Sequence, residues 1–165
     1  MNVRRAANQT LRNVVAAFAL FSTAEAAEPI FREPFTLHLE VDEQHYYEEH
    51  FSKVPFVDRN DIYLFKGDHF GISLGKDGTV EYAKDIDRAD LEFDFSQVKN
   101  KDGLMMLLVI RNRTSHIIAM DALMTVPGKK AIARTTIIPI GAGLSSYESW
   151  PHPIVQLVVR NVHAQ

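Results

Sequence analysis

The segment LEFDF, residues 91–95, alternates apolar and acidic residues and sets the pattern that decides the fold. Successive side chains of a strand point to opposite faces of a sheet, so the three apolar residues would face a core and Glu92 and Asp94 would face solvent. The segment FTLHLEV, residues 35–41, repeats the alternation. Both segments therefore predict β-strands with one wet face.

The run LMMLLVI, residues 104–110, is apolar throughout and too short to cross a membrane. It predicts a central strand buried on both faces. Only the segment 44–51 lacks clean alternation, and it predicts a short helical turn. Further strands are predicted over 70–74, 79–82, 116–126, 131–138 and 154–162, with turn residues at 75–78, 112–115, 127–128 and 139–143.

Roughly eight to ten short strands, with a turn about every 8 to 12 residues, are typical of all-β sandwiches and barrels. The irregular spacing and the fully apolar strand favour an antiparallel β-sandwich of the immunoglobulin-like kind over an up-and-down barrel. No internal repeat or Ser/Gly/Pro-rich linker follows residue 27. We therefore predict one domain over residues 27–165.

Residues 1–26 have the three parts of a secretory signal peptide. Three arginines precede the apolar run 14–21, and Ala-Glu-Ala at 24–26 offers a cleavage site. Eight helical residues span only about 12 Å of a hydrocarbon core roughly 30 Å thick, which argues against a retained anchor. Consecutive rather than amphipathic apolar residues argue against a mitochondrial presequence. We expect a periplasmic or secreted protein with no membrane span in the mature chain.

The mature chain of 139 residues contains no cysteine, so it has no disulfide or thiolate metal site. Its 15 basic and 20 acidic residues give a net charge of −5 with neutral histidines, which makes nucleic acid a poor partner. The charge is −9 over residues 28–103 and +4 over 104–165. The two parts either interleave within one domain or pair across a subunit contact.

Seven histidines without cysteine raise the alternative of a copper or zinc site. His38 and Glu40 would share the wet face of a strand, and His45 and Glu49 would share a face if their segment were helical. The aspartates within 85–90 resemble the start of a calcium loop, but the glycine and glutamate that complete it are missing. No cofactor and no set of metal ligands is therefore assigned.

Catalytic patterns are missing from the sequence: the segment 143–147 does not match a nucleophile elbow, and no metalloprotease or phosphate-loop spacing occurs. Two aromatic residues and two prolines instead make the segment 147–153 distinctive. We predict a stiff loop tip that binds through Tyr147, Trp150 and His152. In the alternative interpretation Trp150 folds back into the core.

Export, small size and the missing catalytic set together predict a binding or accessory β-sandwich protein rather than an enzyme. Its partner would be a protein or a small ligand in the periplasm. Two alternatives stay open. One is a periplasmic metal-binding protein with histidine and carboxylate ligands, and the other is an assembly subunit that pairs through an edge strand or through charged faces.

Overall fold

The structure is a computed structural model that describes residues 28–101 and 103–165, so the predicted signal at 1–26 lies outside the described residues. The described residues form twelve β-strands and one turn of 3₁₀ helix. Every strand pairing is antiparallel. The prediction of an all-β fold with antiparallel sheets is confirmed.

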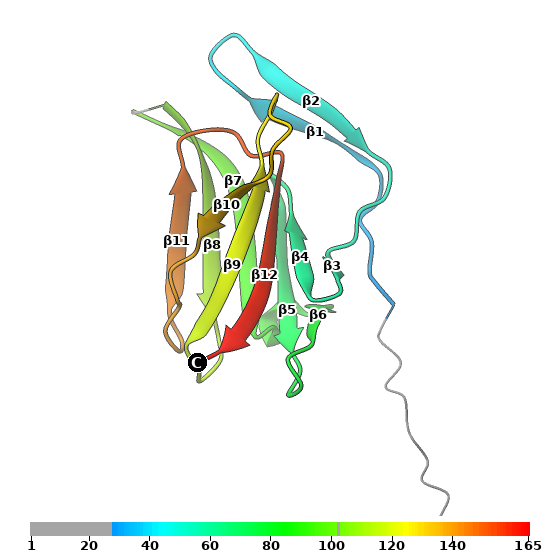
Figure 1. The fold of residues 1–165 in the computed structure, drawn as a ribbon, viewed down its shortest axis with the longest axis vertical. Coiled ribbons are helices and arrows are strands. Elements are labelled where there is room, and N and C mark those ends of the chain that lie inside the picture. Colours follow the sequence, from blue (N-terminus) through cyan, green and yellow to red (C-terminus); the bar gives the residue numbers. More distant parts are fainter. Residues whose placement is uncertain (1–27, 102) are drawn as a thin grey trace, which may run out of the picture.

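Ten of the strands build two five-stranded sheets that face each other as the layers of a sandwich (Figure 1). The sheet that we call the β12 sheet has the order β10 (Ala133–Thr136), β9 (Ile118–Thr125), β12 (Gln156–Ala164), β4 (Asp61–Leu64) and β3 (Val57–Asp58). The other, the β7 sheet, has the order β11 (Ser145–Trp150), β8 (Gly103–Asn112), β7 (Leu91–Asn100), β5 (Asp68–Leu74) and β6 (Val80–Ala83).

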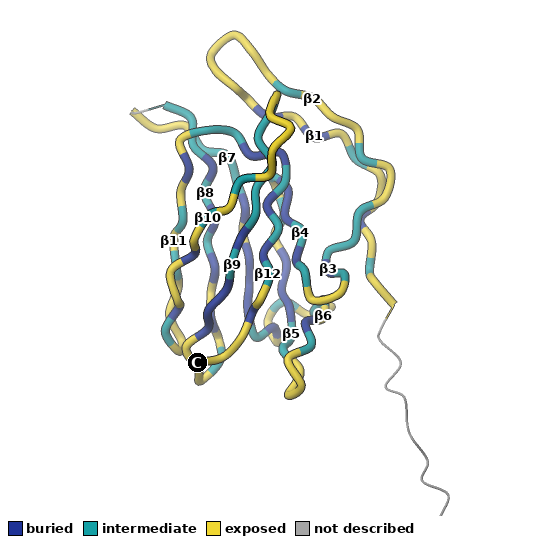
Figure 2. Tube along the Cα trace, in the orientation of Figure 1, coloured by how far each residue is buried: buried dark blue, intermediate teal, exposed yellow. Residues whose placement is uncertain are grey.

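The core lies between these sheets and draws one face from each of them. Phe93 and Phe95 of β7 and Leu157 and Val159 of β12 are fully buried in a single hydrophobic cluster. Burial of each such side chain stabilises the fold by about 1.5–3 kcal/mol relative to leaving it exposed. The alternation that predicted the strand at 91–95 therefore reports its true inner face, and Figure 2 shows buried residues along the strands of both five-stranded sheets.

The segment 44–51 is not helical, so that prediction is wrong. Tyr46–Phe51 is strand β2, which pairs with β1 (Phe35–Glu40) in a hairpin that lies across one end of the sandwich (Figure 1). The alternation was hidden because Glu49, which lies opposite Leu37 on the same face as Tyr47 and Phe51, is polar and exposed. Asp42 closes the connecting turn, since its Oδ1 accepts the N–H groups of residues 44 and 45 at 2.8 and 2.9 Å.

The apolar run 104–110 forms the middle of β8, which lies inside the β7 sheet between β11 and β7. Its expected burial on both faces is wrong, because Met105, Leu107 and Val109 are only half-buried. A sandwich covers each sheet on one face only, so the outer face keeps contact with solvent. That outer face carries one of the two cavities described below.

Most other predicted strands are present with shifted ends, but three were missed. The hairpin around residues 75–78 is β5 and β6, and the turn at 127–128 joins β9 to a shorter β10. Strands β3 and β4 were not predicted, and β11 occupies part of the segment that was interpreted as a loop tip. Within the described ranges, no helix is long and apolar enough to cross a membrane.

Candidate functional site

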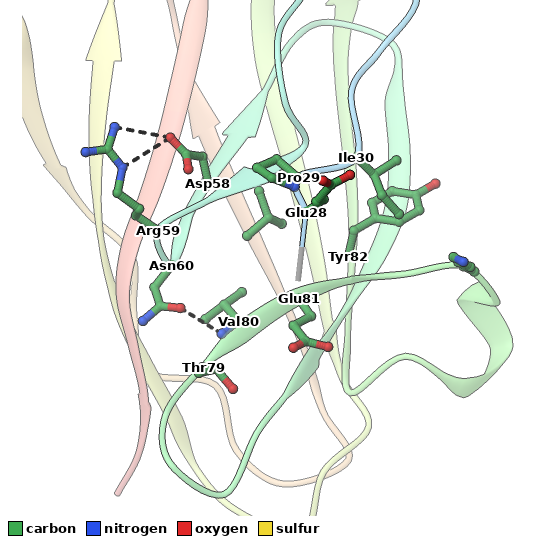
Figure 3. Close-up of a pocket in the computed structure, with 12 residues that line it drawn as sticks. Glu28, Pro29, Ile30, Asp58, Arg59, Asn60, Thr79, Val80, Glu81 and Tyr82 are labelled. Atoms are coloured by element: carbon green, nitrogen blue, oxygen red, sulfur yellow. Dashed lines mark hydrogen bonds and ion pairs between the residues drawn. The ribbon is translucent and has the colours of Figure 1, made fainter. Parts of the chain in front are cut away.

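The larger of the two cavities, which we call the edge groove, has a volume of about 550 Å³. It is lined by residues 28–30, by the β3–β4 turn at 57–60, and by residues 79–82 with Lys84. β3 and β6 are edge strands of different sheets, so the groove lies where the sandwich opens on one side (Figure 3).

The β3–β4 turn forms one wall of the groove, and its backbone is strained. Arg59 and Asn60 have φ angles of 47° and 68°, in the left-handed region that asparagine tolerates better than most residues. The Asn60 Oδ1 atom accepts a hydrogen bond from the backbone N–H of Val80 at 2.9 Å (Figure 3). This bond ties the edge of the β12 sheet to the edge of the β7 sheet.

A buried arginine holds the N-terminal wall. The Arg32 side chain is 7% exposed and forms an ion pair with Asp68 at 2.5 Å. It also donates to the carbonyl oxygens of Pro55 and Tyr63 at 2.7 and 2.5 Å, and its guanidinium lies 4.0 Å from the ring centre of Phe56. Five N–H donors in a fixed fork suit such a multiple contact. The segment before β1 is therefore fixed to the sandwich.

The chemistry of the groove is apolar at the walls and charged at the rim. Its apolar residues are Pro29, Ile30, Val57, Val80 and Tyr82, and its charged residues are Glu28, Asp58, Arg59, Glu81 and Lys84. Histidine, the usual general base near neutral pH, is not among the lining residues. This arrangement is suited to holding a ligand by apolar contact, with charged groups available at the rim.

The second cavity, which we call the Glu92 pocket, has a volume of about 220 Å³ on the outer face of the β7 sheet. Four strands line it, and their residues lie in adjacent register positions. The lining residues are His69, Glu92, Asp94, Val109, Arg111 and Tyr147.

Glu92 is a buried carboxylate on a face where the sequence predicted a solvated one. It is 5% exposed, and its Oε1 lies 2.8 Å from Nε2 of His69 and 3.4 Å from Nη1 of Arg111. Its Oε2 accepts from Arg113, whose guanidinium also donates to the carbonyl oxygen of Asp87 at 2.8 Å. A buried charge needs such partners, because leaving it unpaired is costly.

These contacts decide the protonation state of Glu92. Burial alone would raise its pKa, but the hydrogen bonds from His69 and Arg113 and the charges of Arg111 and Arg113 outweigh burial and lower the pKa below its usual value. Glu92 is therefore ionised at neutral pH, and it fixes the positions of His69 and Arg111 at the pocket wall.

The three residues predicted to bind do not converge. Tyr147 is 70% exposed and lines the Glu92 pocket, whereas Trp150 is 7% exposed and packs edge-on against Phe95 in the core. They lie on opposite faces of β11 because they are three positions apart along the strand. His152 follows the strand and is half-buried. The expected loop tip is thus partly a strand, and Trp150 occupies the core as the alternative interpretation had it.

The expected histidine pairs are only partly realised. His38 and Glu40 share the outer face of β1, where His38 lies 3.1 Å from Glu48 on β2. His45 is in the turn and pairs with Asp42 at 2.9 Å, so its helical pairing with Glu49 is wrong. Over residues 28–101 and 103–165, no group of three or more His, Asp or Glu residues is arranged to hold a metal ion.

Sequence reasoning missed both cavities. The edge groove depends on strands β3 and β4, whose only local signal was the Arg59-Asn60 pair between short apolar segments. The Glu92 pocket depends on Arg111, which lies opposite Glu92 on β8, and on Arg113, which follows the end of that strand. Comparison with protein-family models, curated proteins and solved structures finds no match to this chain.

Proposed function

We propose that this protein is an exported, non-catalytic binding module that takes a small ligand in the edge groove. The observation that carries the proposal is the groove itself, a cavity of about 550 Å³ with apolar walls and a charged rim. Ligand sites have this composition, and drug-sized molecules occupy cavities of about 300–1,000 Å³.

Two fixed walls support the proposal, because a preformed site loses little entropy when a ligand binds. The Asn60–Val80 hydrogen bond holds the two sheet edges together, and the contacts of Arg32 hold the segment that carries Pro29 and Ile30. The ligand would place an apolar body between these walls. Polar groups on it would meet the charged rim.

We further propose an immunoglobulin-like sandwich as the scaffold and the periplasm as the compartment. The chain crosses between the sheets four times, after β4, β8, β10 and β11, which is typical of sandwiches rather than up-and-down barrels. The signal-like residues 1–26 support export. Recovery of a chain that begins at Ala27 from the periplasm of a bacterial host, identified by intact mass, tests the second point.

The groove is tested by screening a library of small aromatic and aliphatic fragments with amide ¹H–¹⁵N NMR spectra of the protein. We expect hits to shift the amide signals of residues 57–60 and 79–82 together. The Glu81→Trp variant places a large ring at an exposed position that lines the groove, and it should abolish those shifts.

Lys76→Trp is the matched control, because Lys76 is exposed in the β5–β6 loop and does not line the groove. It should leave the fragment shifts unchanged. The proposal is wrong if no fragment perturbs the groove, or if the same fragments bind Glu81→Trp as well as they bind the unaltered chain.

A further inference from the structure

The Glu92 pocket holds several polar groups that are fixed in place yet have unused hydrogen-bonding capacity. Nε2 of His69 and one nitrogen of Arg111 contact Glu92, while Nδ1 of His69 and the other Arg111 nitrogens make no hydrogen bond to any described side chain. The Asp94 carboxylate is exposed and makes none either. Donors and acceptors therefore stand side by side around one small cavity.

Charges of both signs surround the pocket, which restricts the ligand: Glu92 and Asp94 are the carboxylates, and Arg111 at the wall and Arg113 behind Glu92 are the guanidinium groups. Asp94 repels an anion, and Arg111 repels a cation. One nitrogen of Arg111 is already paired with Glu92, and its other nitrogens offer N–H donors to a ligand. A zwitterion would have to compete with Glu92 for this guanidinium. An uncharged ligand that carries both donors and acceptors, such as a polyol, meets no like charge.

The shape and the apolar part of the pocket restrict the ligand further. A volume of about 220 Å³ lies below the range of about 300–1,000 Å³ that drug-sized ligands occupy, so it suits a single ring. Tyr147 lies opposite Val109 on the neighbouring strand, is 70% exposed, and makes no hydrogen bond or ring contact with the described residues. Its free ring can cover the apolar C–H face of a ligand.

We propose that the Glu92 pocket is a second binding site, for one neutral sugar ring. The ring lies against Tyr147 and Val109, its hydroxyl groups donate to Asp94 and to Nδ1 of His69, and they accept from Arg111. Glu92 is a positioning residue that holds Arg111 and His69 in place. This site is separate from the edge groove and does not depend on the function proposed there.

Neutral and charged forms of one sugar test the proposal. The probes are methyl β-glucoside, the corresponding glucuronide as the anion and 2-amino-glucoside as the cation, with methyl galactoside and methyl mannoside as other neutral rings. Binding is followed by amide NMR shifts of the residues that line the pocket. We expect at least one neutral glycoside to bind in the millimolar range, and both charged forms of the glucoside to bind more weakly than the strongest neutral ring.

Variants of Tyr147 complete the test. Tyr147→Ala should weaken neutral-sugar binding about five- to tenfold, whereas Tyr147→Phe keeps the ring and should stay within about twofold. Tyr46→Ala is the matched control, since Tyr46 is also 70% exposed but lies on the β1–β2 hairpin. The proposal is overturned if no neutral glycoside binds at tens of millimolar, if a charged sugar or the zwitterion phenylalanine binds more strongly, or if Tyr147→Ala binds as the unaltered chain does.

Discussion

Glu92 shows how far one residue can differ from what its local pattern predicts. The alternation in residues 91–95 places it correctly on the outer face of β7, but an outer position usually means contact with solvent. Arg111 on the adjacent strand and Arg113 just beyond the end of that strand, together with His69, cover its carboxylate. The local sequence pattern predicts the face of the sheet on which a side chain lies. The burial of that side chain depends on residues from neighbouring strands, which are distant in the sequence.

Replacing Glu92 with Gln should lower the free energy of unfolding at pH 7 by about 1–3 kcal/mol, because hydrogen bonds to charged partners are lost. In the folded protein the pKa of Glu92 lies below its ordinary value of 4.5. The ionised carboxylate therefore contributes its full stabilisation to the fold above pH 4.5. This stabilisation is lost as the pH falls through the lowered folded-state pKa. The stability difference between the two proteins should therefore shrink on acidification from pH 7 to below pH 4.

Urea unfolding followed by circular dichroism at several pH values measures this difference. Glu43→Gln is the control, because Glu43 is highly exposed and lies 3.5 Å from Lys99 in a surface pair that contributes little. A difference between Glu92→Gln and the unaltered chain that stays constant from pH 7 to pH 3 would contradict the assignment of Glu92 as an ionised, paired carboxylate.

At the scale of elements, strands with alternating or fully apolar residues could be predicted, and short or mixed ones could not. β1 and β7 have clean alternation and were found, whereas β2 carries the polar Glu49 on the face of Tyr47 and Phe51 and was mistaken for helix. β3 has two residues and β4 has four, too few for a pattern to develop. β11 was missed because its aromatic residues and the two prolines that follow it, at 151 and 153, favoured a loop.

The candidate sites were harder to predict than the strands for a physical reason. Tyr147 was predicted as a binding residue from the composition of its segment, but the groove residues Asn60 and Val80 are 20 positions apart and meet only where two sheet edges come together. A sequence pattern describes one element at a time. The edge groove is a property of two elements from different sheets.

The β3–β4 turn gives a prediction at this scale. Asn60→Gly keeps the left-handed backbone but loses the bond to Val80, and should cost about 1 kcal/mol of stability. Asn60→Ala loses the bond and also strains the backbone, and should cost about 1 kcal/mol more. Calorimetry gives the order of melting temperatures, and amide exchange at Val80 should become faster in both variants.

Lys76→Ala in the exposed β5–β6 loop serves as the control for these two variants. If Asn60→Ala melts at the same temperature as Asn60→Gly, the left-handed backbone of the turn does not contribute to stability. If exchange at Val80 is unchanged in both, the side chain of Asn60 does not connect the two sheets.

At the scale of the whole molecule, the acidic and basic parts of the sequence pair with each other within one chain. Ion pairs join the acidic residues 28–103 to the basic residues 104–165, since Arg111 and Arg113 pair with Glu92, and Arg160 lies 3.7 Å from Asp61. These contacts favour interleaving over a charge-driven contact between subunits.

We therefore expect a monomer at both low and high salt. Size-exclusion chromatography with light scattering at about 20 mM and 500 mM sodium chloride measures the mass directly, and these concentrations span weak and strong screening of surface charge. A dimer at low salt that dissociates at high salt would instead support assembly through the charged faces.

Different contacts join the edges of the two sheets on the two sides of the sandwich. On one side the contact involves a tryptophan, whose fluorescence can be measured. On the side away from the edge groove, Nε1 of Trp150 on β11 donates to Oγ1 of Thr135 on β10 at 3.1 Å, which links the two sheets there. Trp150 is the only tryptophan in the chain. Its fluorescence should be blue-shifted while the sheets stay together and should move to the red when they separate. Because Trp150 lines neither cavity, ligand binding should leave this emission unchanged, and a red shift would report unfolding alone.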